Sequence, residues 1–237
     1  MKSKGKYIGI SNRIPINLLE YAISHYVRTG KIDSIDYLKS VKEYTKGENR
    51  AKKTLTHITT IINKNTSILD LISKKCQNDF AFFSENDRKV ILLCMYSLAF
   101  PIAYDILNGL AVGFKVQENI SKRVVLEKTG SLYGSNRSMH IAVDETLPIF
   151  LQAGIIERIK IGMYKKSRPL QVNNQTAIEL VIYTDLKLSS SKSILVDDLE
   201  YKPWFGYFAF THSSPENFNI LISLKDSAIG KGYLTLK

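Results

Sequence analysis

Basic and amide side chains that could bind a polyanion are concentrated between residues 121 and 170. This stretch holds nine basic and four acidic residues, a net charge of +5. Arginine and lysine bind phosphate oxygens, and arginine and asparagine can also hydrogen-bond the base edges of DNA. Residues 1–60 carry a further +7, whereas residues 61–120 are neutral and residues 171–237 carry −1. The charge is therefore localised, which favours one polyanion-binding face over a uniformly basic surface.

Two helices are predicted to carry the first of these charges. A short amphipathic helix over 121–129 stops at Gly130, and a Gly/Ser/Asn turn follows. A second periodic run extends from about Ser138 to Ala153. Gly154 then ends this helix and opens directly into a strand.

A basic hairpin is predicted directly after the second helix. Its strands, over 155–161 and 163–172, are hinged near Gly162. A helix followed by such a hairpin suits a duplex, because the helix fits the major groove and the hairpin lies on the phosphates. The pattern therefore predicts a winged helix-turn-helix that binds double-stranded DNA.

The N-terminal half of the second helix is where base edges would be read. Asn136 and Arg137 suit adenine and guanine, and His140 falls on the same side. Asp144 places a negative charge on this face unless it pairs with His140 one turn away. Pro148 removes a helical hydrogen bond, so the helix is expected to kink there or to restart just before it.

Phosphate contacts are expected from the start of the first helix, from the hairpin and from a predicted helix near residue 50. Each basic residue alone is most simply a solvated surface charge. Together they would neutralise several phosphates and give a steep dependence of affinity on salt. The full set of candidate DNA-binding residues is Arg50, Lys52, Lys53, Lys122, Arg123, Asn136, Arg137, His140, Arg158, Lys160, Lys165, Lys166 and Arg168.

Residues 1–118 are predicted to form a bundle of five or six short amphipathic helices. Pro15 suits a helix start, and apolar residues follow at helical spacing until Gly30. The remaining helices are expected after a cap at Asp33, from Glu48 to about Asn63, after Thr66 or Ser67, after a cap at Ser84, and from Pro101 to Phe114.

The apolar segment from Val90 to Phe114 requires a test for a membrane span. It carries one charge, Asp105, and Pro101 interrupts it. Its longest uncharged run, 90–104, is 15 residues, whereas a span needs roughly 20. We interpret the segment as two buried helices.

Residues 174–237 are predicted to form a small strand-rich part packed on the rest. Strands are expected at 178–183, 204–210, 218–224 and 233–236, with loops at 189–193 and 212–217 and a helix over 175–186 as the alternative to the first strand. The predicted fold is thus α+β and mainly α. It comprises a helical bundle (1–118), a winged helix-turn-helix (119–173) and this C-terminal part (174–237).

An enzyme is the less favoured interpretation. Asp185-Leu186-Lys187 has the acidic-x-Lys spacing of metal-dependent nucleases, in which the carboxylate would bind Mg²⁺ and the lysine would stabilise developing charge. The second carboxylate would have to be Glu179, Asp144 or Glu145. We expect instead that Asp185 and Lys187 face solvent with no other acid nearby. No catalytic residue, metal or cofactor is therefore predicted.

The cysteines indicate a reducing compartment, and the N-terminal residues do not have the pattern of a signal peptide. Cys76 and Cys94 form no CxxC pair and lie near no paired histidines, which disfavours a disulfide framework or a structural zinc. The apolar run Tyr7–Ile10 is too short for a signal peptide. We expect a cytoplasmic protein without membrane association.

The order of these parts resembles the BrxA proteins of the BREX phage-defence systems. The resemblance covers roughly residues 10–170. It rests on a basic helix start at Glu48-Asn49-Arg50, apolar helices near 90–114, and a winged helix ending in Leu151-Gln152-Ala153-Gly154-Ile155-Ile156. It implies a NusB-like helical domain and a non-catalytic DNA-binding subunit of an antiviral defence complex, with other subunits as partners. The competing hypothesis is a protein-interaction adaptor whose basic faces meet an acidic partner.

Overall fold

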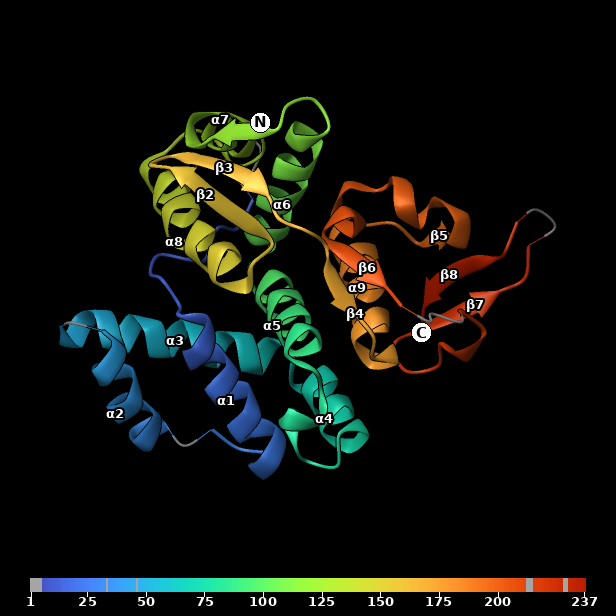
Figure 1. The fold of residues 1–237 in the computed structure, drawn as a ribbon. Coiled ribbons are helices and arrows are strands. Elements are labelled where there is room, and N and C mark those ends of the chain that lie inside the picture. The colour runs from blue at the N-terminus through green and yellow to red at the C-terminus, as the bar shows by residue number, and fades with distance from the viewer. Residues whose placement is uncertain (1–5, 33, 46, 212–214, 228–229) are drawn as a thin grey trace, which may run out of the picture.

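The computed structural model describes residues 6–32, 34–45, 47–211, 215–227 and 230–237 (Figure 1). The protein is an α+β fold dominated by helices, with small sheets in its second half. The helices that come first in the chain are α1 (Ile16–Thr29), α2 (Ser34–Tyr44), α3 (Glu48–Lys64), α4 (Thr66–Lys75), α5 (Glu85–Ala99) and α6 (Pro101–Phe114), with a short 3₁₀ helix η1 (Phe80–Phe82) before α5.

The boundaries of these helices follow the local signals in the sequence. Pro15 directly precedes α1, and Pro101 is the first residue of α6. The Ser84 hydroxyl accepts a hydrogen bond from the Asp87 backbone N–H at 3.2 Å, so Ser84 caps α5 as predicted. Asp33, the predicted cap of α2, lies outside the described residues.

Helix α5 lies at the centre of the molecule (Figure 1). It packs against α1, α3 and α6, and also against the later helices α8 (Arg137–Ala153) and α9 (Gln175–Leu188). Every residue from 90 to 97 is buried, and α6 turns away from α5 by 115°. This confirms the two buried helices predicted for residues 90–114. No single helix in the described ranges is long and apolar enough to cross a bilayer; only α5 and α6 taken together would be.

The middle of the chain forms two helices and a three-stranded antiparallel sheet. Strands β1 (Asn119–Ser121) and β2 (Ile156–Lys160) flank β3 (Met163–Lys166) in the order β1-β3-β2. Tyr164 of β3 lies opposite Ile120 of β1 on one side and opposite Arg158 of β2 on the other. Ile120, Tyr164 and Ile156 are buried and fix this sheet on the helices. The elements in chain order are β1 (Asn119–Ser121), α7 (Lys122–Tyr133), α8, β2 (Ile156–Lys160) and β3 (Met163–Lys166).

The predicted end of the first helix at Gly130 is wrong, because α7 continues to Tyr133. Gly130 is an interior residue of α7, and a Cβ there would stand 3.4 Å from the Met139 side chain. That is an ordinary contact distance, so Gly130 is an interior helical residue and neither ends nor bends the chain there. The turn is made instead by Gly134, whose φ of 80° is a conformation that side-chain-bearing residues rarely adopt.

Helix α8 continues through Pro148 without the restart that was the alternative to a kink in the prediction. A proline removes the hydrogen bond to the carbonyl four residues earlier, which here belongs to the exposed residue Asp144. Water can satisfy that carbonyl, while Pro148 itself is buried. The predicted glycine stop is confirmed: Gly154 ends α8 in the left-handed conformation.

The C-terminal part begins with a helix rather than the strand predicted at 178–183. That strand is wrong, and the helical alternative holds: α9 spans Gln175–Leu188 and is capped by Asn174, which accepts from the Thr176 N–H. Nearly every residue of α9 is buried, so its β-branched run shows no helical period. Packing against α5 overrides the local strand propensity.

Two small sheets complete this part. Strand β4 (Leu170–Val172) pairs in parallel with β6 (Phe208–Phe210). Strands β5 (Ser193–Leu195), β8 (Tyr233–Leu236) and β7 (Ile222–Lys225) form an antiparallel sheet in that order. The strand predicted at 233–236 is confirmed. The other two predicted strands begin later than expected, because residues 203–207 form a 3₁₀ helix and β7 begins only at Ile222. The loop predicted at 189–193 loses its last residue to β5, and residues 212–214 of the other predicted loop lie outside the described residues. The elements are β4 (Leu170–Val172), β5 (Ser193–Leu195), η2 (Val196–Tyr201), η3 (Pro203–Tyr207), β6 (Phe208–Phe210), η4 (Pro215–Asn217), β7 (Ile222–Lys225) and β8 (Tyr233–Leu236).

Candidate nucleic-acid interface

Most of the exposed residues of α8 lie in its first turn. Arg137, Ser138 and His140 are exposed, whereas all residues from 146 to 150 are buried. Met139 is fully buried between them and anchors this end of the helix. The helix thus presents the basic side chains of its N-terminal half to solvent and uses its C-terminal half for packing. This is the arrangement expected of a helix that reads a groove with its N-terminal residues.

Asn136 has a structural role in addition to any role in reading bases. Its side-chain oxygen accepts a hydrogen bond from the Met139 backbone N–H at 3.0 Å and caps α8. The carbonyl oxygen of the amide is therefore committed to the helix. Of the three predicted reading residues, Arg137 and His140 keep exposed side chains with no such role.

Asp144 pairs with Lys122 and not with His140 as the sequence suggested. The side chains are 36% (Lys122) and 49% (Asp144) exposed, so the pair lies at the surface. The backbone N–H of Lys122 also donates to the Gly162 carbonyl at 2.7 Å. Lys122 therefore links the start of α7 to α8 and to the hairpin turn. Its charge is already partnered, so a phosphate would have to compete with Asp144 for Lys122.

The basic residues of β3 point in different directions. Lys165 lies opposite Glu157, and their side chains form an ion pair of 3.0 Å. Lys166 lies opposite the buried Ile156, and its Nζ is 5.8 Å from the centre of the Tyr207 ring. Partial burial and the nearby charge of Lys115 lower the pKa of Lys166. Lys165 is therefore neutralised by Glu157, whereas Lys166 is exposed and without an ion pair but lies beside Tyr207.

Three basic side chains of the hairpin region remain free. Arg158, Lys160 and Arg168 are exposed and have no hydrogen bond or ion pair to any residue that the structure describes. Arg158 and Arg168 line the same open groove of about 590 Å³, between the end of α8 and β2. Glu157 also lines this groove, but its carboxylate is paired with Lys165. The hairpin therefore offers two arginines and a lysine to an anionic ligand.

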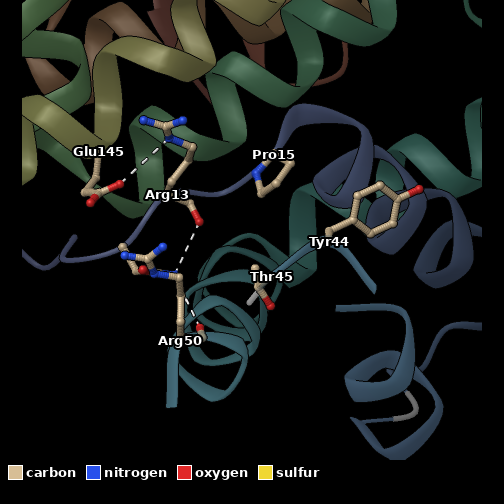
Figure 2. Close-up of a pocket in the computed structure, with 7 residues that line it drawn as sticks. Arg13, Pro15, Tyr44, Thr45, Arg50 and Glu145 are labelled. Atoms are coloured by element: carbon tan, nitrogen blue, oxygen red, sulfur yellow. Dashed lines mark hydrogen bonds and ion pairs between the residues drawn. The ribbon is translucent and has the colours of Figure 1, made fainter. Parts of the chain in front are cut away.

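The remaining candidates are scattered over other surfaces. Lys52 pairs with Glu48 at 3.0 Å and Arg123 with Glu127 at 2.8 Å, in each case one turn away on the same helix. Lys53 is exposed on α3. Arg50 lines a separate pocket together with Arg13 (Figure 2). Sequence reasoning missed Arg13, which lies in an irregular segment before α1 where no periodicity assigns it a side.

The acidic-x-Lys sequence on α9 does not form an exposed site. Asp185 is buried, which contradicts the predicted solvent exposure, whereas Lys187 is exposed. The Asp185 carboxylate accepts from the Tyr104 hydroxyl at 2.6 Å and pairs with Lys202. Burial and the negative charge of Asp185 raise the pKa of Tyr104. The carboxylate therefore serves as a buried tie between α6, α9 and η3.

The other candidate carboxylates of a nuclease are also committed elsewhere. Both oxygens of the buried Glu179 accept backbone N–H groups of residues 219–221, at 2.8 to 2.9 Å. Asp144 and Glu145 lie near Lys122 and Arg13. Among the described residues, no three or more His, Cys, Asp or Glu side chains are grouped as metal ligands would be.

Comparison of the chain with protein-family models, with curated proteins and with solved structures gave no significant match. The function is therefore argued from geometry and charge.

Proposed function

We propose that this protein binds duplex DNA through a winged helix-turn-helix formed by α6, β1, α7, α8, β2 and β3. The observation that carries the proposal is the combination of chain order and free charge. The chain order of that fold is a helix, a short strand, two helices joined by a short turn, and a hairpin. Here the turn between α7 and α8 has three residues, and β1 pairs with the hairpin strand β3. Unpartnered basic side chains lie on its last helix, α8, and on the hairpin region.

In the proposed complex α8 enters the major groove by its N-terminal half. Arg137 and His140 face base edges, and Asn136 is the helix cap at the entry to the groove. Arg158, Lys160 and Arg168 contact phosphates beside it. Helices α1 to α5 would form the supporting N-terminal bundle.

The dependence of duplex affinity on salt concentration tests the proposal directly. Fluorescence anisotropy with a labelled duplex should show affinity falling tenfold or more between about 50 and 200 mM salt. The double variant Arg158→Ala/Lys160→Ala should weaken binding to every duplex and flatten the salt slope by about two. The matched control is Lys74→Ala/Lys75→Ala, which removes two exposed lysines from the last turn of α4.

Two results would overturn the proposal. One is the absence of measurable duplex affinity at low salt, which would favour an adaptor that binds an acidic protein. The other is an equal loss of affinity in the hairpin and α4 variants, which would mean that only overall charge matters.

We also propose that the protein performs no DNA chemistry of its own and acts in the cytoplasm as a subunit of an antiviral defence complex. The support for the first part is the commitment of Asp185 and Glu179 to buried interactions. The support for the second is the BrxA-like order of parts in the sequence. Supercoiled plasmid should remain intact with the purified protein and Mg²⁺ or Mn²⁺, and cleavage that disappears in Asp185→Ala would refute the non-catalytic assignment.

A further inference from the structure

A pocket of about 350 Å³ lies where three distant segments of the chain meet (Figure 2). Arg13 and Pro15 come from the segment before α1, and Glu145 comes from the middle of α8. Tyr44 is the last residue of α2 and Thr45 follows it, and Arg50 lies in the first turn of α3. The volume is at the lower end of the range found for small-molecule sites.

A buried asparagine sets the positions of the two arginines. Asn12 is only 6% exposed, and its side-chain NH₂ group donates to the backbone carbonyls of Arg13 at 3.4 Å and Arg50 at 3.3 Å. The same group donates to the Thr54 hydroxyl. Arg13 and Arg50 are 37 positions apart in the sequence, yet Asn12 connects both backbones at the pocket that all three residues line.

The pocket carries an excess of positive charge. The Arg13 Nε atom is 3.9 Å from a Glu145 carboxylate oxygen, beyond hydrogen-bond distance. The Arg50 guanidinium has no hydrogen bond or ion pair to any side chain in the part of the chain that the structure describes. The lining thus contains two guanidinium groups and one carboxylate. Their forked donors match the oxygens of a phosphate, which can accept from both.

The rest of the lining suits a ring beside the phosphate. Tyr44 is 56% exposed and lies across the pocket from Arg13 and Arg50 in Figure 2. Its ring offers a flat apolar surface, whereas the Thr45 hydroxyl is already used to donate to the Val41 carbonyl at 2.7 Å. Glu145 is an acceptor for sugar hydroxyls.

We propose that this pocket binds a nucleoside 5′-monophosphate group, with Arg13 and Arg50 on the phosphate and Tyr44 against the base. The group can come from a free mononucleotide or from the 5′-phosphorylated end of a DNA strand, since both present the same chemistry. None of the residues that line the pocket is among those that the proposed function places on the duplex, and the proposal does not depend on duplex binding.

Isothermal titration calorimetry with the full chain tests the site. The probes are 5′-dAMP, deoxyadenosine and inorganic phosphate. We expect 5′-dAMP to bind at least tenfold more tightly than either of the others, because only it engages both the arginines and Tyr44. Arg13→Gln and Arg50→Gln should each weaken 5′-dAMP binding at least tenfold. Arg28→Gln, at an exposed arginine of α1, is the matched control and should leave binding unchanged.

Competition identifies the source of the group. A short duplex with 5′-phosphorylated ends displaces 5′-dAMP better than its 5′-hydroxyl counterpart if strand ends are the ligand, and equally if a free nucleotide is. The proposal is overturned if 5′-dAMP does not bind at millimolar concentration. It is also overturned if Arg13→Gln/Arg50→Gln binds it like wild type with an unchanged circular dichroism spectrum, or if phosphate alone binds as tightly.

Discussion

Two acid–lysine pairs of the same composition lie in opposite environments in this protein. Asp144 of α8 and its partner Lys122 are 49% and 36% exposed, whereas Asp185 of α9 is 2% exposed and its partner Lys202 29%. Exposed pairs contribute little to stability and can exchange partners with a ligand. A buried carboxylate must keep its partners, because an uncompensated buried charge is strongly destabilising.

The contrast extends to the two regions that contain the pairs. The unit from β1 to β3 keeps unpartnered cations on α8 and the hairpin, and these are available to a polyanion. In the C-terminal part, the Glu179 carboxylate accepts backbone N–H groups. The Asp185 carboxylate accepts from the Tyr104 hydroxyl and pairs with Lys202. The first region is therefore suited to binding and the second to holding the fold together.

The largest difference between the two pairs is expected in their effect on the free energy of unfolding. Asp185→Ala should lower the free energy of unfolding by about 3 kcal/mol, since it leaves the Tyr104 hydroxyl and the part-buried Lys202 without their acceptor. Asp144→Ala should change it by less than about 1 kcal/mol. Urea unfolding followed by the fluorescence of the buried Trp204 measures both. Equal losses in the two variants would contradict the comparison.

A smaller effect is expected in sequence recognition. Once a preferred duplex has been selected from a random library, Arg137→Ala should cost about 1–3 kcal/mol on that duplex and relax the preference at one position. Lys160→Ala should weaken preferred and random duplexes equally, because phosphate contacts carry no sequence information. A uniform loss in Arg137→Ala would remove α8 from the major groove.

Breaking the exposed pair should strengthen DNA binding. Asp144→Asn removes a negative charge beside α8 and frees Lys122, so affinity should rise about threefold and the salt slope should steepen. The same change at Asp185 should leave affinity unaltered, provided that the variant is folded. Anisotropy titrations at two salt concentrations measure both, and a fall in affinity for Asp144→Asn would show that Lys122 acts only through its pairing.

The smallest effect concerns pH and a buried histidine. Burial, and to a lesser degree the charge of Lys53, lower the pKa of His57 below its ordinary value of 6.5. In the unfolded chain His57 therefore takes up a proton at a higher pH than in the folded protein. The free energy of unfolding should fall as the pH is lowered below about 6.5, towards the lower pKa of the folded state. His57→Gln should reduce this dependence, whereas His140→Gln, at an exposed site on α8, should preserve it.

Helix positions could be predicted where the signals are local. Pro15, Ser84 and Gly154 act on their own helix ends, and the predicted boundaries there agree with the structure. The strand predicted at 178–183 failed because α9 is buried on almost every side and so has no amphipathic period. The end of α7 was misplaced because the helix continues through Gly130 and the turn is made at Gly134 instead.

The candidate interface was predictable in composition but not in geometry. Arg158 and Lys160 are exposed and unpartnered, as a basic hairpin requires. The pairing of Lys122 with Asp144 joins residues 22 positions apart and depends on how α7 packs on α8. The direction of Lys166 depends on η3, which contacts it from a segment about 40 residues later. Such contacts are set by tertiary structure, and no local pattern encodes them.

The packing of α5 against α9 also constrains how this chain can be made. The apolar face of α5 is covered by a helix that ends roughly 90 residues further along the chain, and Asp87 accepts the backbone N–H groups of Asn173 and Asn174. At a synthesis rate of about 5–20 residues per second, that face stays uncovered for about 5–20 s until α9 has been synthesised. During each round of translation the N-terminal helices therefore expose a surface that favours aggregation, and a chain truncated before α9 would expose it permanently.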